Sequence, residues 1–211
     1  MMTNTLRTSV VLGLFALSAC NTSSTLTPAT PVLLPPPVGP VLRQPTTGTV
    51  ASLSIASATF ANGAAQPTSA AFSGCGGQNV SPQLTWSAGP ATTKSYVVTE
   101  FDPDAPTGVG FWHWIVFNIP ANVTSLAAGF GTTTPADGTT FGLTDFGTTG
   151  YGGPCPPVGD GPHRYTFTVS ATDLTTPIAG LTGSSTTGAY LTFNLNGHVL
   201  AQGTYVGTYS R

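Results

Sequence analysis

Charged side chains are scarce in this sequence, and none of them forms a basic run. Among 211 residues, five are Lys or Arg and seven are Asp or Glu, and the formal net charge is −2 at pH 7. A protein that binds nucleic acid needs a basic patch to neutralise phosphates, so that class of function is excluded. Because charge is so rare, we expect the places where it gathers to be places where chemistry needs it.

Long helical patterns are also missing, because 26 Gly and 19 Pro residues break the chain. Instead, short runs of strand-forming residues alternate with turn clusters from Thr49 onward. The predicted strands cover residues 94–101, 113–119 and 163–172, with weaker candidates at 52–60, 82–87 and 203–210. Residues 185–201 alone fit a helix of more than two turns. The predicted fold is mainly β: an antiparallel β-sandwich with one late helix and few short helices.

The one long apolar run lies at the N-terminus. Arg7 precedes the apolar stretch Val10–Leu17, which ends in the letters LSAC at Cys20. This pattern is typical of a secretory signal and is too short for a membrane span. Its ending resembles the bacterial lipobox, in which the cysteine is lipidated after cleavage. We therefore predict a lipoprotein signal at residues 1–20 and an exported protein anchored to the bacterial cell envelope. An ordinary cleaved signal and an uncleaved anchor are the alternatives.

The segment after Cys20 has a different composition from the rest of the chain. Residues 21–48 are rich in Pro and Thr and show no periodicity, which is typical of a flexible, extended tether. No chemistry is expected there. The folded domain is predicted to cover residues 49–211.

Two histidines begin predicted strands. Because side chains alternate between the faces of a strand, His163, Tyr165 and Phe167 share one face of the run HRYTFTV. By the same period, His113 shares a face with Ile115 in the run HWIVF. Each histidine thus starts a stripe that becomes hydrophobic further along. This arrangement predicts a polar pocket at one edge of the sandwich.

Several motifs in a fixed order identify a family resemblance. They include NVSPQLTW, DPDAPTGVGFWHWIVFN, GYGGPCPPVGDGPHRY and the closing GHVLAQGTYVGTYSR. Together they resemble the phosphatidylethanolamine-binding protein family, in its bacterial Raf kinase inhibitor-like branch, over essentially the whole folded part. The resemblance implies a β-sandwich whose small pocket binds anionic groups such as phosphate, and in some members a phospholipid head group.

The resemblance also implies which residues form the pocket. They are Asp102, Asp104, His113, Gly153, Pro157, His163 and Tyr165. Imidazoles donate hydrogen bonds to phosphate oxygens, and a carboxylate held against one ring raises its pKa. Two imidazolium groups against one carboxylate would make the site net positive. We expect a small anionic or phosphate-bearing ligand, bound without catalysis and without a cofactor. For Asp104, an Asx turn or a bond to Arg164 is the structural alternative.

Three other functions stay open. The trio Asp102, His113 and His163 also has the residue types of a two-histidine, one-carboxylate metal site. The same trio acting on a water molecule would make a weak hydrolase, although no serine stands beside either histidine as a triad nucleophile would. Family members include inhibitors of kinases and proteases, which implies an interaction module. Nothing in the sequence names a protein partner.

The remaining cysteines form an even pair. With Cys20 lipidated, Cys75 and Cys155 would face an oxidising compartment, which favours a disulfide. Their loops belong to the same family motif set, so we expect them to lie close together. Two buried thiols are the alternative.

One backbone feature is also expected from the resemblance. The crowded run DPDAP suggests a cis peptide bond between Asp102 and Pro103, which costs only about 0.5–1 kcal/mol before proline. A cis bond would turn Asp102 into the pocket.

Overall fold

The computed structural model of the protein describes residues 50–133 and 135–211. The predicted lipoprotein signal, its Cys20 and the predicted tether at 21–48 lie outside these residues. Within the described part of the chain, no helix combines the length and the apolar character needed to cross a membrane.

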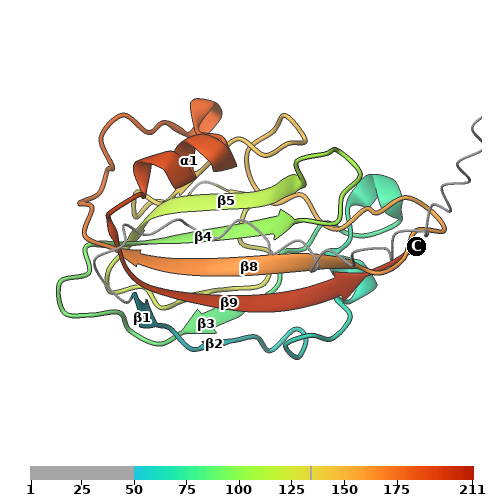
Figure 1. Ribbon diagram of the computed structural model, residues 1–211, viewed down its shortest axis with the longest axis horizontal. Helices are drawn as coiled ribbons and strands as arrows, with labels where there is room; N and C mark the ends of the chain where they lie inside the picture. Colours follow the sequence, from blue (N-terminus) through green and yellow to red (C-terminus); the bar gives the residue numbers. More distant parts are fainter. Residues whose placement is uncertain (1–49, 134) are drawn as a thin grey trace, which may run out of the picture. The chain divides into compact units, whose positions relative to one another are not determined.

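Six strands form the larger sheet, in the order β1-β9-β8-β4-β5-β7 (Figure 1). Their bounds are β1 Ala51–Ser52, β4 Ser95–Asp102, β5 Phe111–Pro120, β7 Thr140–Phe141, β8 His163–Thr172 and β9 Val199–Tyr209. Neighbouring strands run antiparallel, except that β1 is parallel to β9. The three strongest predicted strands are β4, β5 and β8, which lie side by side at the centre of this sheet.

A second sheet of three short antiparallel strands has the order β2-β3-β6. Its strands are β2 Ile55–Ala56, β3 Leu84–Trp86 and β6 Ser125–Leu126. The predicted strand at 52–60 is thereby divided, because β1 joins the large sheet and β2 the small one. Three 3₁₀ turns complete the short elements, namely η1 Thr68–Ala70, η2 Ser73–Cys75 and η3 Gly183–Ser185.

The helix α1, Gly188–Asn194, is shorter than predicted. The side chain of Thr187 caps its N-terminus by accepting a hydrogen bond from the Tyr190 N–H. Soon after its last turn, Gly197 adopts a φ of 84°, and the chain then enters β9 at Val199. The expectation of more than two turns over 185–201 was therefore wrong, because the last part of that stretch is strand.

The two faces of the large sheet bury separate cores. Trp114 and Phe167 belong to the core that includes Leu84 of the small sheet. Ile115 of β5 belongs to a second core with Leu191 of α1, which covers the opposite face (Figure 1). Alternate residues of one strand thus serve two cores, as the pleat requires. The predicted sandwich with a late helix is confirmed.

Candidate functional site

A cavity of about 230 Å³ lies at the end of the large sheet where β4 ends and β5 and β8 begin. Its polar lining includes Asp102, Thr107, His113, His163 and Tyr165, and its apolar lining includes Phe111, Phe146, Pro106, Pro156 and Pro157. Five of the predicted site residues therefore come together here, namely Asp102, His113, Pro157, His163 and Tyr165.

Strand order explains why residues far apart in sequence converge. Asp102 is the last residue of β4, and His163 is the first residue of the antiparallel neighbour β8. On the other side of β4, Asp102 pairs with Phe111 at the start of β5. The end of β4 therefore lies between the beginnings of the two strands that carry the histidines.

A β-bulge in β5 places His113. Trp112 pairs with Phe101 and Trp114 pairs with Glu100, so His113 is an extra residue in the ladder. The bulge puts His113 on the face of Trp114, where its ring lies 5.1 Å from that of Tyr165, centroid to centroid.

This geometry corrects the sequence reading of β5. Ile115 belongs to the core under α1, on the opposite face of the sheet from the pocket. The prediction that His113 shares a face with Ile115 was wrong, because simple alternation fails at a bulge. His113 is also the third residue of β5 rather than the first.

Asp102 holds His163 by a short hydrogen bond. Its Oδ2 lies 2.8 Å from Nδ1 of His163, and both side chains are buried. The other carboxylate oxygen, Oδ1, accepts from the backbone N–H groups of Asp104 and Ala105, at 2.8 and 3.1 Å. The carboxylate is thus fixed between a local turn and the imidazole.

The predicted cis bond between Asp102 and Pro103 was wrong. Within the described ranges, the cis peptide bond is Thr176–Pro177, so Asp102–Pro103 is trans. Asp102 still reaches the pocket, because the direction of β4 and the turn at its end already point the side chain there.

The two carboxylates beside His163 determine its charge. Burial lowers the pKa of His163, but the hydrogen bonds and charges of Asp102 and Asp160 outweigh burial and raise the pKa above its ordinary value. Asp160 approaches Nε2 at 3.4 Å, and its side chain is 48% exposed. His163 is therefore favoured as an imidazolium.

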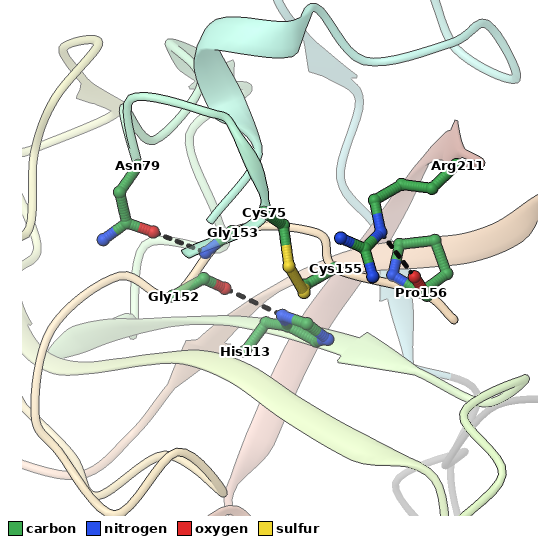
Figure 2. Close-up of a disulfide and its surroundings, with 8 residues drawn as sticks. All are labelled: Cys75, Asn79, His113, Gly152, Gly153, Cys155, Pro156 and Arg211. Atoms are coloured by element: carbon green, nitrogen blue, oxygen red, sulfur yellow. Dashed lines mark hydrogen bonds between the residues drawn. A yellow bond between two sulfur atoms is a disulfide. The ribbon is translucent and has the colours of Figure 1, made fainter. Parts of the chain in front are cut away.

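His113 has the opposite electrostatic character. Its Nδ1 lies 2.8 Å from the carbonyl oxygen of Gly152, and a carbonyl can only accept, so Nδ1 carries the proton (Figure 2). Burial lowers the pKa of His113, although the carbonyl and the charge of Asp102 oppose this in part. The ring is neutral at pH 7. Of the two histidines, only His163 is favoured as a cation, so the case of two imidazolium groups against one carboxylate does not apply.

Two predicted site residues do not line the cavity. Asp104 accepts three hydrogen bonds from Arg164, two from its side chain at 2.9 and 2.7 Å and one from its backbone N–H. These bonds lower the pKa of Asp104 and fasten the turn after β4 to β8. The N–H of Gly153 donates to the side chain of Asn79 at 2.7 Å (Figure 2). A Cβ at Gly153 would lie 1.9 Å from the Ala70 carbonyl oxygen, so close packing requires glycine there.

A disulfide joins Cys75 of η2 to Cys155 in the pocket wall, with the two Cα atoms 5.7 Å apart (Figure 2). The linked residues are 80 positions apart in the sequence. A crosslink over a loop of this length stabilises by about 4–5 kcal/mol in the chain-entropy model. The predicted pair is thus bonded, and the bond holds the segment that also carries Gly152.

Sequence reasoning missed the aromatic wall and one charged neighbour. Phe146 lies in a loop, and the centroid of its ring stands 4.8 Å from that of Phe111 and 5.4 Å from that of His113. The two consecutive aromatic residues Phe111 and Trp112, directly before His113, were the sequence pattern that could have indicated an aromatic wall. Asp160 sits in a loop whose conformation no pattern predicted.

The geometry of the described residues does not support the alternative of a metal site at Asp102, His113 and His163. Across residues 50–133 and 135–211, no group of three or more His, Cys, Asp or Glu side chains is arranged to hold a metal ion. The Nδ1 atoms of His113 and His163 are both directed at oxygen atoms of the protein.

Known proteins resemble this chain in sequence and in fold. Residues 56–210 match the family model described as phosphatidylethanolamine-binding protein. The chain is 48% identical to UPF0098 protein YbhB of Escherichia coli over 143 residues, covering 66% of this chain and 88% of that protein. The crystal structure of E. coli YbcL, described as a new member of the mammalian PEBP family, matches with a TM-score of 0.70 and 42% identity, covering 76% of this chain and 99% of YbcL.

A third similarity is to a protein of Mycobacterium tuberculosis, LppC, whose name calls it a lipoprotein. It is 45% identical over 117 residues, which cover 56% of this chain and 54% of LppC.

Proposed function

The chain belongs to the phosphatidylethanolamine-binding protein family, and from this premise we propose that it binds small phosphate-bearing ligands without catalysis. The observation that carries the proposal is the cavity itself, in which an imidazolium held by a buried carboxylate lies at the base of apolar walls. Such a site suits a charged head group attached to an organic part.

Two hydrogen-bond donors are available to a ligand oxygen. The Nε2–H of His163 faces only the half-exposed Asp160, at the long distance of 3.4 Å. The hydroxyl of Tyr165 is buried and forms no hydrogen bond of ordinary geometry among the described residues, although the backbone of Cys155 and the carboxylate of Asp102 lie close enough to affect its pKa. An unpaired buried hydroxyl costs about 1–3 kcal/mol, so a ligand oxygen that accepts from it would bring stabilisation. These donors are the atoms that we assign to the phosphate.

The walls limit the size and the polarity of the ligand. Phe111, Phe146 and Pro157 offer apolar surface beside the polar floor. A cavity of about 230 Å³ is smaller than the roughly 300–1,000 Å³ of sites for drug-sized molecules. The proposed ligand is therefore a small phosphate ester or a lipid head group rather than a whole lipid.

Two side chains of the lining that could act as nucleophiles, Thr107 and Asp102, already have hydrogen-bond partners within the protein. Thr107 is a hydroxyl residue of the pocket rim, and its Oγ1 donates to the Gly110 carbonyl oxygen at 2.6 Å. Asp102 is occupied by His163 and by the turn that follows it. These contacts support binding without turnover, and the hydrolase alternative becomes an outcome of the test.

We also propose that Cys20 carries a lipid anchor that holds this binding domain at the bacterial cell envelope. The support is the LSAC pattern at the end of the N-terminal apolar run, together with the similarity to a mycobacterial protein named as a lipoprotein. The membrane is then a partner through the anchor.

Calorimetric titration of the full chain with phenyl phosphate tests the binding proposal. We expect His163→Ala to lose at least about tenfold in affinity, since a charge-assisted hydrogen bond contributes about 1.5–3 kcal/mol. His198→Ala is the matched control, because that half-exposed histidine pairs with Asp173 outside the pocket. Unchanged binding by His163→Ala would contradict the proposal. Phosphate release by the wild type that His163→Ala abolishes would establish the hydrolase instead.

A further inference from the structure

The pocket floor presents a hydrogen-bond acceptor as well as donors. His113 donates from Nδ1 to Gly152, and a neutral imidazole has a single N–H, so its Nε2 carries a lone pair. Figure 2 shows this second nitrogen at the side of the ring turned away from Gly152. Because His113 lines the cavity, the lone pair is available to a ligand.

The surroundings of His113 keep this acceptor from becoming a donor. The titratable groups that face it are Asp102 of β4, His163 and Tyr165 of β8, and Asp145 of the loop after β7. Burial lowers the pKa of His113, and it outweighs the opposing effects of the backbone of Gly152 and Gly153 and of the charges of Asp102 and Asp145.

Further acceptors surround the donor of His163. Oδ2 of Asp102 and Oδ2 of Asp160 lie 2.8 and 3.4 Å from its two ring nitrogens. A ligand oxygen that approaches Nε2 of His163 therefore comes close to the carboxylate of Asp160. An anion whose oxygens can only accept hydrogen bonds meets lone pairs at His113 and at Asp160.

We propose that the pocket selects phosphate monoesters in their singly protonated form and rejects fully ionised anions of the same shape, such as sulfate monoesters. The inference rests on the proposed function and adds the protonation state of its ligand. The P–OH group donates to Nε2 of His113, while the other phosphate oxygens accept from His163 and Tyr165. A phosphate monoester takes up this proton with a pKa of about 6, whereas a sulfate monoester stays fully ionised.

Phenyl phosphate and phenyl sulfate provide the test, because they share size, shape and the aromatic ring that would contact Phe111 and Phe146. We expect the full chain at pH 6 to bind phenyl phosphate at least about tenfold more tightly, since the sulfate ester leaves a buried acceptor unpaired. Between pH 6 and pH 8, the affinity for phenyl phosphate should fall as the dianion replaces the monoanion. The affinity for phenyl sulfate should stay low throughout.

His113→Gln localises the selectivity. Its amide can turn an N–H group toward the ligand, so we expect the ratio of the two affinities to narrow to within about threefold. His198→Gln, outside the pocket, should keep the wild-type ratio. If His113→Gln does not fold, the ratio of the wild-type affinities for phenyl phosphate and phenyl sulfate, and its dependence on pH, still test the proposal.

Each outcome separates the inference from the proposed function. Equal binding of the two esters by the wild type would overturn the selectivity and leave the proposed function standing. Tight binding of phenyl sulfate with uptake of a proton would do the same, because His113 would then be the group that gains the proton. Failure of both esters to bind would overturn the proposed function and the inference with it.

Discussion

Asp102 and Glu100 stand on the same face of β4, yet they lie in two regions with opposite properties. Asp102 is at the pocket end, where His163 and two backbone N–H groups satisfy its oxygens. Glu100 lies one step deeper, opposite Trp114 of β5 and Phe167 of β8. Both of its oxygens are buried, and within the described part of the chain they form no hydrogen bond of ordinary geometry, although the side-chain amide of Gln66 lies close enough to affect the pKa of Glu100. The same functional group thus has a partner of opposite charge in one region and none in the other.

The buried carboxylates of β4 stay ionised only where they are paired. At the pocket, each buried charge has a partner of opposite sign, so ionisation is compatible with folding. In the closed core, burial raises the pKa of Glu100 well above its ordinary value, and the amide of Gln66 opposes this only in part. Glu100 is therefore held neutral. Whether a buried carboxylate of β4 is ionised therefore depends on its hydrogen-bonding and charged partners and not on the strand that carries it.

Removing the ionisable group of Glu100 is expected to have the largest effect. Because the folded pKa is raised, the unfolded state loses its proton first as the pH rises above about 4.5, and stability is lost at about 1.4 kcal/mol per pH unit until the folded group also ionises. Glu100→Gln keeps the shape and cannot ionise. We expect unfolding by urea to show similar stability of variant and wild type at pH 4 and a more stable variant at pH 7. A variant less stable than the wild type at pH 7 would show that the carboxylate is satisfied.

Asp102→Asn would remove the carboxylate that pairs with His163, so the pocket, like the core around Glu100, would lack a buried ion pair. Without the carboxylate, the effect of burial on His163 is less opposed, so its pKa should fall toward that of His113. Nuclear magnetic resonance titration of the ring would show this fall, and phenyl phosphate affinity at pH 7 should drop about 10- to 100-fold as the imidazolium is lost.

The same substitution changes the pH dependence of stability. With its raised folded pKa, His163 contributes stability fully below about pH 6.5, and this contribution is lost as the pH rises through the folded pKa. Asp102→Asn should remove that contribution. Asp173→Asn, which breaks the half-exposed pair with His198, is the matched control and should leave binding unchanged. A His163 pKa unaltered by Asp102→Asn would contradict the assignment.

Features set by regular alternation could be predicted from the sequence. The bounds predicted for β8, 163–172, are those observed, because His163, Tyr165 and Phe167 alternate without interruption. The meeting of Asp102 with His163 followed from their places at strand ends.

Features set by local departures from regularity could not be predicted. The bulge that turns His113 toward Tyr165 leaves no mark in the alternation of β5. The neutral state of His113 depends on the carbonyl of Gly152, 39 positions away, which no side-chain pattern reports. Phe146 and Asp160 lie in loops, where position depends on tertiary contacts rather than on period.

Asp160 is a third carboxylate, paired more loosely than Asp102, and its removal should change binding least. Asp160 occupies Nε2 of His163, the same donor that the proposed ligand needs, yet at 3.4 Å and with 48% of its side chain exposed. Asp160→Asn should free this donor and remove a charge that repels anions. It should also lower the pKa of His163 slightly, although the shorter bond to Asp102 keeps the ring protonated at pH 6.

At pH 6, the gain in affinity from freeing Nε2 of His163 should outweigh the loss caused by its lower pKa. The reason is that an exposed ion pair contributes only about 0–1 kcal/mol, so losing the pair with Asp160 costs His163 little. We therefore expect Asp160→Asn to bind phenyl phosphate about two- to fivefold more tightly at pH 6, with a smaller gain at pH 8, where less imidazolium remains. Added salt should reduce the gain, since it screens the removed charge. A loss of affinity at pH 6 would mean that Asp160 orients His163 for the ligand instead of competing with it.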